Sequence, residues 1–246
     1  MIDLRHSRSG IIAGHPVEWF DTLDSTMTLA TLLARDKCPH GTIIGADEQT
    51  AGIGRQGHSW HSERGTGLYV SIVLRLAKPA PVITLALGLA VQEAIAQLTG
   101  LAPDLRWPND VLIDGLKCAG ILTQLDGDAV IAGIGINVSQ AAFPPDLEAT
   151  SLLLAGATVT RENVLATLVQ AIDRCCSILQ EQGPDAILRM FEASSSYAVG
   201  RRVRVDQVDG VVEGVTRGLD PAGFLIVRRD NGQDTTILAG GVRPCS

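Results

Sequence analysis

The pattern of hydrophobic residues changes at about Ala198, and this change constrains the fold more than any single motif. Before it, strand-like runs alternate with long helical stretches. After it, only short β-rich runs remain, spaced about 8–12 residues apart and separated by glycine, proline, asparagine and aspartate turn residues. Short strands at such spacing are typical of a small all-β barrel. We therefore predict two domains, residues 1–196 and 197–246.

The first domain is predicted to be α+β, a mixed β-sheet packed against helices. Asp24–Thr26 supplies cap residues for the first helix, and Pro79 and Pro81 open the longest apolar helix, which Gly100 ends. We expect strands at 17–20, 42–46, 68–74, 104–107, 111–113, 118–125 and 129–138, and helices at 24–34, 79–98, 161–182 and 184–192. In the second domain we expect strands at 202–205, 210–215, 224–228 and 235–238.

Charge and cysteine usage exclude several classes of protein. The formal net charge of −7 argues against a dedicated nucleic-acid binder, which needs a basic face. The apolar stretch 81–98 contains Gln92, Glu93 and Gln97, so it indicates a buried helix and not a membrane span. The five cysteines form no CxxC pair, which predicts no zinc site and a reducing compartment. The N-terminus has no apolar run after its basic residues, so we predict no signal peptide and a cytoplasmic protein.

A glycine-rich loop follows the strand expected at 42–46. Its residues 52–57 match the pattern GxGxxG, but residues 58–65 show no helical period, so the loop does not open a dinucleotide-binding helix. A P-loop is also absent, because no G-K-[ST] follows. The loop can instead bring free backbone N–H groups, Arg55 and Arg64 to a phosphate. The alternative is a mobile surface loop with a solvated arginine.

The turn Arg106-Trp107-Pro108-Asn109-Asp110 lies between two expected strands. Asp110 is a candidate ligand for Mg²⁺ or a ligand cation, since carboxylates suit that hard metal, although Asn109 and Asp110 could also only cap the turn. Lys117 begins the next expected strand, where its ammonium could contact an anionic group. The alternative interpretation is that its side chain only extends from the strand end into solvent.

The strand Gly133-Ile134-Gly135-Ile136-Asn137 is unusually rich in glycine. Glycine weakens a strand, so we expect a ligand or another backbone to approach closely there, with a bulge as the alternative. The amide of Asn137 offers both a donor and an acceptor, which could bind the edge of a purine.

Taken in this order, the motifs resemble those of biotin–protein ligases. The resemblance is close over about residues 17–140, and the C-terminal β-rich part resembles the SH3-like domain of that family in position and size only. It rests on Asp24-Ser25-Thr26, Ala46–Gly57 with Trp60, Gly67–Ser71, Arg106–Asp110, Lys117 with Ala119–Leu122, and Gly133–Asn137. It implies a catalytic domain of the class II synthetase type.

The resemblance also implies a reaction in two steps. A carboxylate oxygen of biotin attacks the α-phosphate of ATP to give biotinyl-5′-AMP and pyrophosphate, and a lysine of an acceptor protein then attacks the mixed anhydride. Catalysis is assigned to Lys117 and Arg55, with Mg²⁺ and Asp110 as its ligand. Biotin binding is assigned to Ser25, Thr26, Met27, Gln49, Gly52, Ile53, Gly54 and Gly120, and ATP or adenylate binding to Arg55, Trp60, Asn109, Lys117 and Asn137.

The partner implied by the resemblance is a biotin carboxyl carrier protein or domain. About 16 residues precede the first expected strand, too few for a DNA-binding helix-turn-helix, so we predict no DNA binding. Homodimers through a sheet edge are common in that family, although no residue here specifies one. Met27 and Ile53 depart from the family pattern, which has Asn and a basic residue there. A lipoate ligase or acyltransferase is the nearest alternative, and a non-catalytic adenylate-binding regulator is another.

Overall fold

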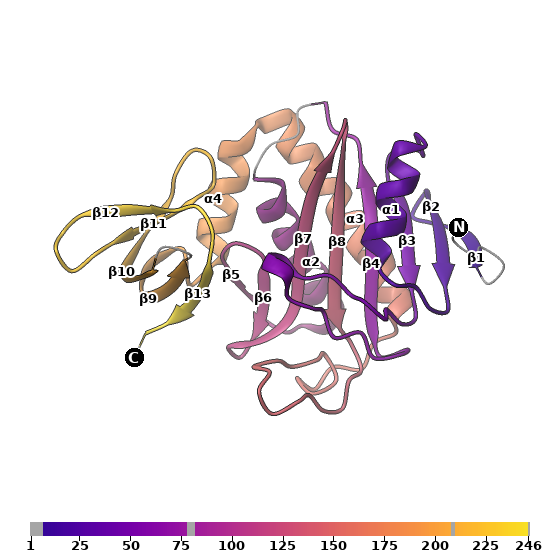
Figure 1. Cartoon of the computed structure of the whole chain (residues 1–246), viewed down its shortest axis with the longest axis horizontal. Helices are drawn as coiled ribbons and strands as arrows, with labels where there is room; N and C mark the ends of the chain where they lie inside the picture. The colour runs from indigo at the N-terminus through magenta and orange to yellow at the C-terminus, as the bar shows by residue number, and fades with distance from the viewer. Residues whose placement is uncertain (1–6, 78–81, 208–209, 246) are drawn as a thin grey trace.

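The computed structural model describes residues 7–77, 82–207 and 210–245, which form two β-sheets (Figure 1). One sheet has eight strands in the order β1-β2-β3-β4-β8-β7-β6-β5, and the other has five in the order β12-β11-β10-β9-β13. The strands of the first are β1 Ser7–Ile12, β2 His15–Phe20, β3 Thr42–Ala46, β4 Gly67–Leu74, β5 Asp104–Arg106, β6 Asp110–Ile113, β7 Leu116–Asp126 and β8 Ala129–Asn137. Those of the second are β9 Val199–Gln207, β10 Gly210–Leu219, β11 Leu225–Arg228, β12 Asp234–Ile237 and β13 Gly241–Pro244.

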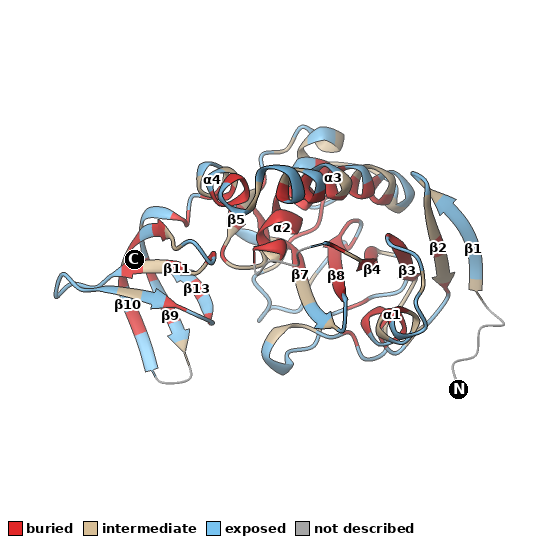
Figure 2. Cartoon of the chain, turned by 90° about the horizontal axis from the view of Figure 1, so that it is seen from above, coloured by how far each residue is buried: buried red, intermediate tan, exposed pale blue. Residues whose placement is uncertain are grey.

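The larger sheet is covered by helices on both faces (Figure 2). It is mixed, because β2 and β3 run parallel while the other neighbouring strands run antiparallel. Helix α1 (Thr26–Arg35) packs on one face, and α2 (Ile83–Thr99) and α3 (Arg161–Gln182) pack on the other, followed by α4 (Pro184–Ser194). Side chains of β3 alternate between these faces, so Ile43 joins the core under α2 and α3 whereas Ile44 joins the core under α1. The predicted α+β class is confirmed.

Strands with weak sequence signals were missed. β1 carries the polar segment SRSG, lies at the edge of the larger sheet and is mostly exposed, so it shows no hydrophobic alternation. β13 is short and contains Gly241 and Pro244. The predicted helix at 161–182 is confirmed with Thr160 as its N-cap, whose hydroxyl accepts from the N–H of Asn163. α2 begins at Ile83, and Pro79 and Pro81 lie outside the described residues.

The C-terminal all-β unit is a five-stranded antiparallel sheet. Hydrogen bonds join it to the preceding part of the chain. The indole N–H of Trp107 donates to the carbonyl of Gly223 (2.9 Å), and the N–H of Leu219 donates to the carboxylate of Glu192 on α4 (2.7 Å). The turn before β6 is therefore held by both sheets. No helix in the described part of the chain is long and apolar enough to cross a membrane.

Candidate active site

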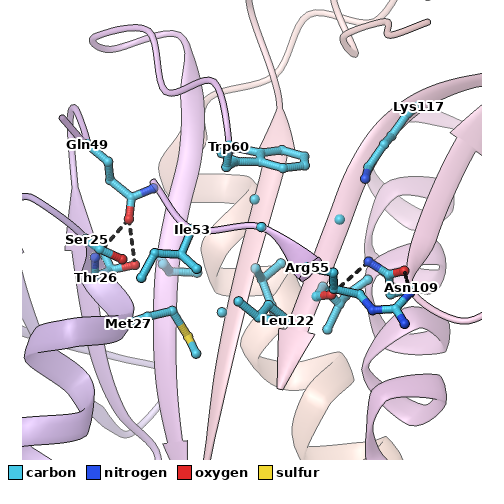
Figure 3. Close-up of a pocket in the computed structure, with 17 residues that line it drawn as sticks. Ser25, Thr26, Met27, Gln49, Ile53, Arg55, Trp60, Asn109, Lys117 and Leu122 are labelled. Carbon is cyan, nitrogen blue, oxygen red and sulfur yellow. Dashed lines mark hydrogen bonds between the residues drawn. The ribbon is translucent and has the colours of Figure 1, made fainter. Parts of the chain in front are cut away.

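A pocket opens on the larger sheet between the start of α1, the loop after β3 and strands β7 and β8 (Figure 3). Segments far apart in the sequence meet here. The lining residues are Ser25, Thr26, Met27, Gln49, Ile53, Gly54, Arg55, Trp60, Val70, Asn109, Lys117, Gly120, Ile121, Leu122, Gly133, Ile134 and Gly135.

The glycine-rich loop forms a hairpin over this pocket, which we call the hairpin (residues 52–60). The N–H of Gly54 donates to the carbonyl of His58 (2.7 Å), and the N–H of Trp60 donates to the carbonyl of Gly52 (2.8 Å). These amides are used inside the hairpin, so the expectation of free backbone N–H groups is wrong for them. Gly52 does not line the pocket; a Cβ there would lie 2.6 Å from the carbonyl oxygen of Trp60, so glycine lets the two arms approach.

Three glycines of β7 and β8 form the floor of the pocket, under two large side chains. A Cβ on Gly120 would lie 2.8 Å from the indole ring of Trp60, and one on Gly135 would lie 2.6 Å from its Nε1. A Cβ on Gly133 would lie 2.6 Å from the sulfur of Met27. The glycines therefore permit a close approach, but the approaching groups are the side chains of Trp60 and Met27 and not the ligand or backbone that the sequence led us to expect.

One end of the pocket carries neutral polar groups, and we call it the neutral end. The side-chain carbonyl of Gln49 accepts from the N–H (2.8 Å) and the hydroxyl (3.1 Å) of Thr26, and its amide donates to Ser62 (3.0 Å). Ser25, the N-cap of α1, makes no side-chain capping bond, and its buried hydroxyl has no hydrogen-bond partner among the residues that the structure describes. Since buried polar groups are normally bonded, this hydroxyl is a candidate contact for a ligand.

The other end carries cations, and we call it the cationic end. Nη1 of Arg55 donates to Oδ1 of Asn109 (2.9 Å), and Asn109 is fixed by its own bond to the carbonyl of Ile121 (3.0 Å). Nζ of Lys117 lies 2.6 Å from Oδ1 of Asp110 and 5.3 Å from the ring centre of Trp60. Burial lowers the pKa of Arg55, and the charge of Asp110 opposes this effect.

Asp110 differs from its predicted role. Its second oxygen pairs with Arg106 (2.8 Å), so its carboxylate lies between two cations. No cluster of three or more metal-ligating side chains is found within the described ranges. The turn 106–110 thus holds the two predicted catalytic cations, Arg55 through Asn109 and Lys117 through Asp110, and the residues present do not form a free carboxylate site for Mg²⁺.

A second cavity of about 410 Å³ adjoins the pocket and shares Trp60 and Lys117 with it. Asn137 lines this cavity and not the pocket, and its amide nitrogen already donates to the carbonyl of Thr150 (2.9 Å). Arg243 of β13 also lines it. Arg243 had no signal in the sequence, because it lies about 126 residues from Lys117 and outside every motif.

Comparison with known proteins agrees with this geometry. A family model described as "Biotin/lipoate A/B protein ligase family" matches residues 19–140, and one described as "Biotin protein ligase C terminal domain" matches residues 198–242. The chain is 34% identical over 255 residues to the Mycobacterium tuberculosis protein named "Biotin--[acetyl-CoA-carboxylase] ligase", covering 98% of this chain and 94% of that protein. It is 34% identical over 243 residues to "Bifunctional ligase/repressor BirA" of Bacillus subtilis, covering 94% of this chain and 74% of that protein.

Among solved structures, the biotin protein ligase of Aquifex aeolicus in complex with biotin and ATP superposes with a TM-score of 0.82 at 30% identity. The match covers 93% of this chain and 99% of that one. Because these similarities extend over both sheets and over the segments that build the pocket, the chain belongs to the biotin protein ligase family.

Proposed function

We propose that the pocket binds biotin at its neutral end and joins the biotin carboxylate to ATP at its cationic end. The enzyme is an ATP-dependent biotin–protein ligase, which forms biotinyl-5′-AMP and transfers biotin to a lysine of an acceptor protein. The observation that carries the proposal is the polarity of the pocket. A buried hydroxyl that has no partner in the described part of the chain, that of Ser25, and two paired cations, Arg55 and Lys117, line one pocket.

The neutral end suits the ureido group of biotin. A ureido group has one carbonyl acceptor and two N–H donors, and hydroxyl and amide side chains can satisfy both kinds. The hydroxyl of Ser25 can donate to the carbonyl, and the hydroxyl of Thr26 can accept from one N–H group. The carbonyl oxygen of Gln49 can accept from the other N–H group in exchange for one of its two bonds from Thr26. An unbranched acyl chain has no use for this polar set, which favours biotin over lipoate.

The cationic end suits the phosphates. In the first step a biotin carboxylate oxygen forms a bond to the α-phosphorus, and the bond from that phosphorus to the bridging oxygen breaks, releasing pyrophosphate. In the second step the acceptor amine attacks the acyl carbon, AMP leaves, and the amine loses a proton. Lys117 and Arg55 stabilise negative charge on the phosphate, and they need little reorganisation because Asp110 and Asn109 already hold them.

Both substrates require the hairpin to move. In the described conformation the side chains of Trp60 and Met27 lie against the glycine floor, and the pocket provides only about 50 Å³, far less than ligand pockets usually provide. Mg²⁺ would enter bound to the phosphates of ATP, since this metal is often held mainly by substrate phosphates and water. Asn137 and Arg243 lie in the adjoining cavity, where the purine and the phosphates would extend.

The test is incubation with ATP, Mg²⁺ and either biotin or lipoate, followed by measurement of pyrophosphate release. We expect release with biotin and none above background with lipoate. Release with lipoate alone would show that the chain is a lipoate ligase instead. Binding of adenylate without any release would favour the non-catalytic regulator.

The acceptor, by this proposal, is a biotin carboxyl carrier protein or domain. The other assignments are a cytoplasmic location, supported by five free cysteines, and no DNA binding, supported by the net charge of −7. Tight, salt-sensitive binding to a biotin-operon operator in a gel shift would contradict the latter. A homodimer would use the exposed edge of β1, and sedimentation at increasing concentration tests it.

A further inference from the structure

Asp47 is a largely buried carboxylate that the proposed reaction does not use. It directly follows β3 and begins the segment that carries Gln49 and the hairpin. Its side chain is 16% exposed and does not line the pocket. A buried charge needs partners, and the partners of this one come from elements that are distant in the sequence.

The Asp47 carboxylate collects donors from three elements. Trp19 on β2 donates its indole N–H to Oδ1 (2.9 Å), and Arg161, the first residue of α3, donates to the same oxygen (2.9 Å). Arg8 on β1 donates to Oδ2 (3.1 Å). The carboxylate thus joins the outer two strands of the larger sheet to the N-terminus of the helix that packs on it.

The Trp19 donor is held in a fixed orientation. Its indole ring lies against Gly45, where any Cβ would collide with the ring. The guanidinium of Arg161 lies over the ring, 5.6 Å from its centre, at a distance suited to a cation–π contact. The N–H of Trp19 therefore points at Asp47 because the ring has little freedom to turn.

The backbone of Asp47 closes the base of the loop. Its carbonyl accepts from the N–H of Gly65 (2.9 Å), where the chain returns from the hairpin, and its N–H donates to the carbonyl of Phe20 (2.9 Å). The next residue, Glu48, accepts from the N–H of Leu23 (3.1 Å). Both ends of the loop are therefore fixed at Asp47, two residues before Gln49.

We infer that Asp47 is a positioning residue for biotin binding, acting through Gln49 and the hairpin. The inference rests on the proposed function of the pocket, because it assigns Gln49 to biotin. By this inference Asp47 does not contact the substrate. It fixes the start of the loop, so that the side-chain carbonyl of Gln49 can accept from Thr26 and the hairpin can pack on the three glycines of the pocket floor.

The strength of this network differs from that of a surface ion pair. Exposed pairs contribute little because solvent screens them, whereas Asp47 is mostly shielded and one of its donors is a neutral indole. Burial would raise the pKa of Asp47, but the hydrogen bonds from Trp19 and Arg161 and the charge of Arg8 bring it below its usual value. The carboxylate is therefore ionised at neutral pH, in the form that accepts all three bonds.

The experiment compares Asp47→Asn with Asp126→Asn in the full chain. Asp126, at the end of β7, is a matched control: its side chain is 15% exposed and accepts three hydrogen bonds, all from Arg35. For Asp47→Asn we expect KM for biotin to rise about tenfold and kcat to stay within about twofold, because an amide cannot accept all three bonds. Amide hydrogen exchange of residues 48–62 is expected to quicken about tenfold. The control should change neither quantity.

A second variant, Trp19→Phe, removes one donor and keeps a ring, so we expect changes in the same direction of about threefold. Wild-type KM and wild-type exchange in Asp47→Asn would overturn the inference. So would faster exchange spread evenly over both sheets, which would mean general destabilisation. If wild-type protein releases no pyrophosphate with biotin, the proposed function fails, while the exchange of residues 48–62 still reports on the anchoring of the loop.

Discussion

The two ends of the pocket are prepared for their ligands in opposite ways. At the neutral end, one buried hydroxyl, that of Ser25, lacks a partner within the described ranges, so a ligand adds a bond that these residues do not make alone. At the cationic end, Arg55 and Lys117 already have partners in Asn109 and Asp110, so a ligand must share or exchange them. The difference suggests that the neutral end contributes mainly to biotin affinity, and the cationic end mainly to the rate of the chemical step.

The largest expected effect comes from removing Lys117, which tests the cationic end directly. Lys117→Ala should lower kcat for pyrophosphate release by about 10²–10³-fold, since it removes one preorganised electrostatic donor. Single-turnover kinetics with saturating biotin and ATP would measure it, with the exposed Lys37→Ala as control. A near-normal rate would show that Lys117 is only structural.

Asp110→Asn should have the next largest effect, a fall in kcat of about 10–30-fold with little change in KM for biotin. The amide keeps the shape but removes the charge that lies between Lys117 and Arg106, so the lysine is no longer held in place. The same kinetic assay applies. A rise in KM for biotin with an unchanged kcat would contradict the division between the two ends.

Ser25→Ala tests the neutral end. We expect KM for biotin to rise about three- to tenfold and kcat to stay near the wild-type value, because one neutral hydrogen bond to the ligand is lost. Isothermal titration with biotin alone measures the Kd for biotin without catalysis, and we expect the Kd to rise by a similar factor. An equal fall in kcat at saturating biotin would mean that this end also contributes to the transition state.

Ile53→Arg should change least, by less than about threefold in either constant. Ile53 forms a β-bridge with Ser59 through its backbone, and the residue is 47% exposed, so the family's basic residue can be accommodated. A larger gain in affinity for biotinyl-5′-AMP, measured by competition, would show that charge at this position matters.

Local patterns predicted most of the fold, and the helix at 161–182 followed from its period and its Thr160 cap. Ser25, Gln49, Arg55 and Lys117 were assigned to the site through the family resemblance, and in the structure they line one pocket. The β1 strand was missed, because an exposed edge strand needs no hydrophobic alternation.

The pairing of polar groups could not be predicted, because it depends on register and side-chain reach. Asp110 has the residue type of a metal ligand, and only the tertiary fold brings Arg106 and Lys117 to its two oxygens. Asp47 lies in the motif Ala46–Gly57, but its donors Trp19 and Arg161 lie 28 and 114 residues away in the chain.

The hydrogen bond from Trp107 to Gly223 bears on how the protein unfolds. It ties the turn that holds Lys117 to the C-terminal sheet, and the two sheets share one hydrophobic core, with Leu105 and Val111 on one side and Leu225 on the other. Neither sheet can separate without exposing apolar surface of its neighbour. We therefore expect a single cooperative melting transition. A destabilising substitution in the C-terminal sheet should then lower the melting temperature reported by a probe in that sheet and by a probe in the active site equally.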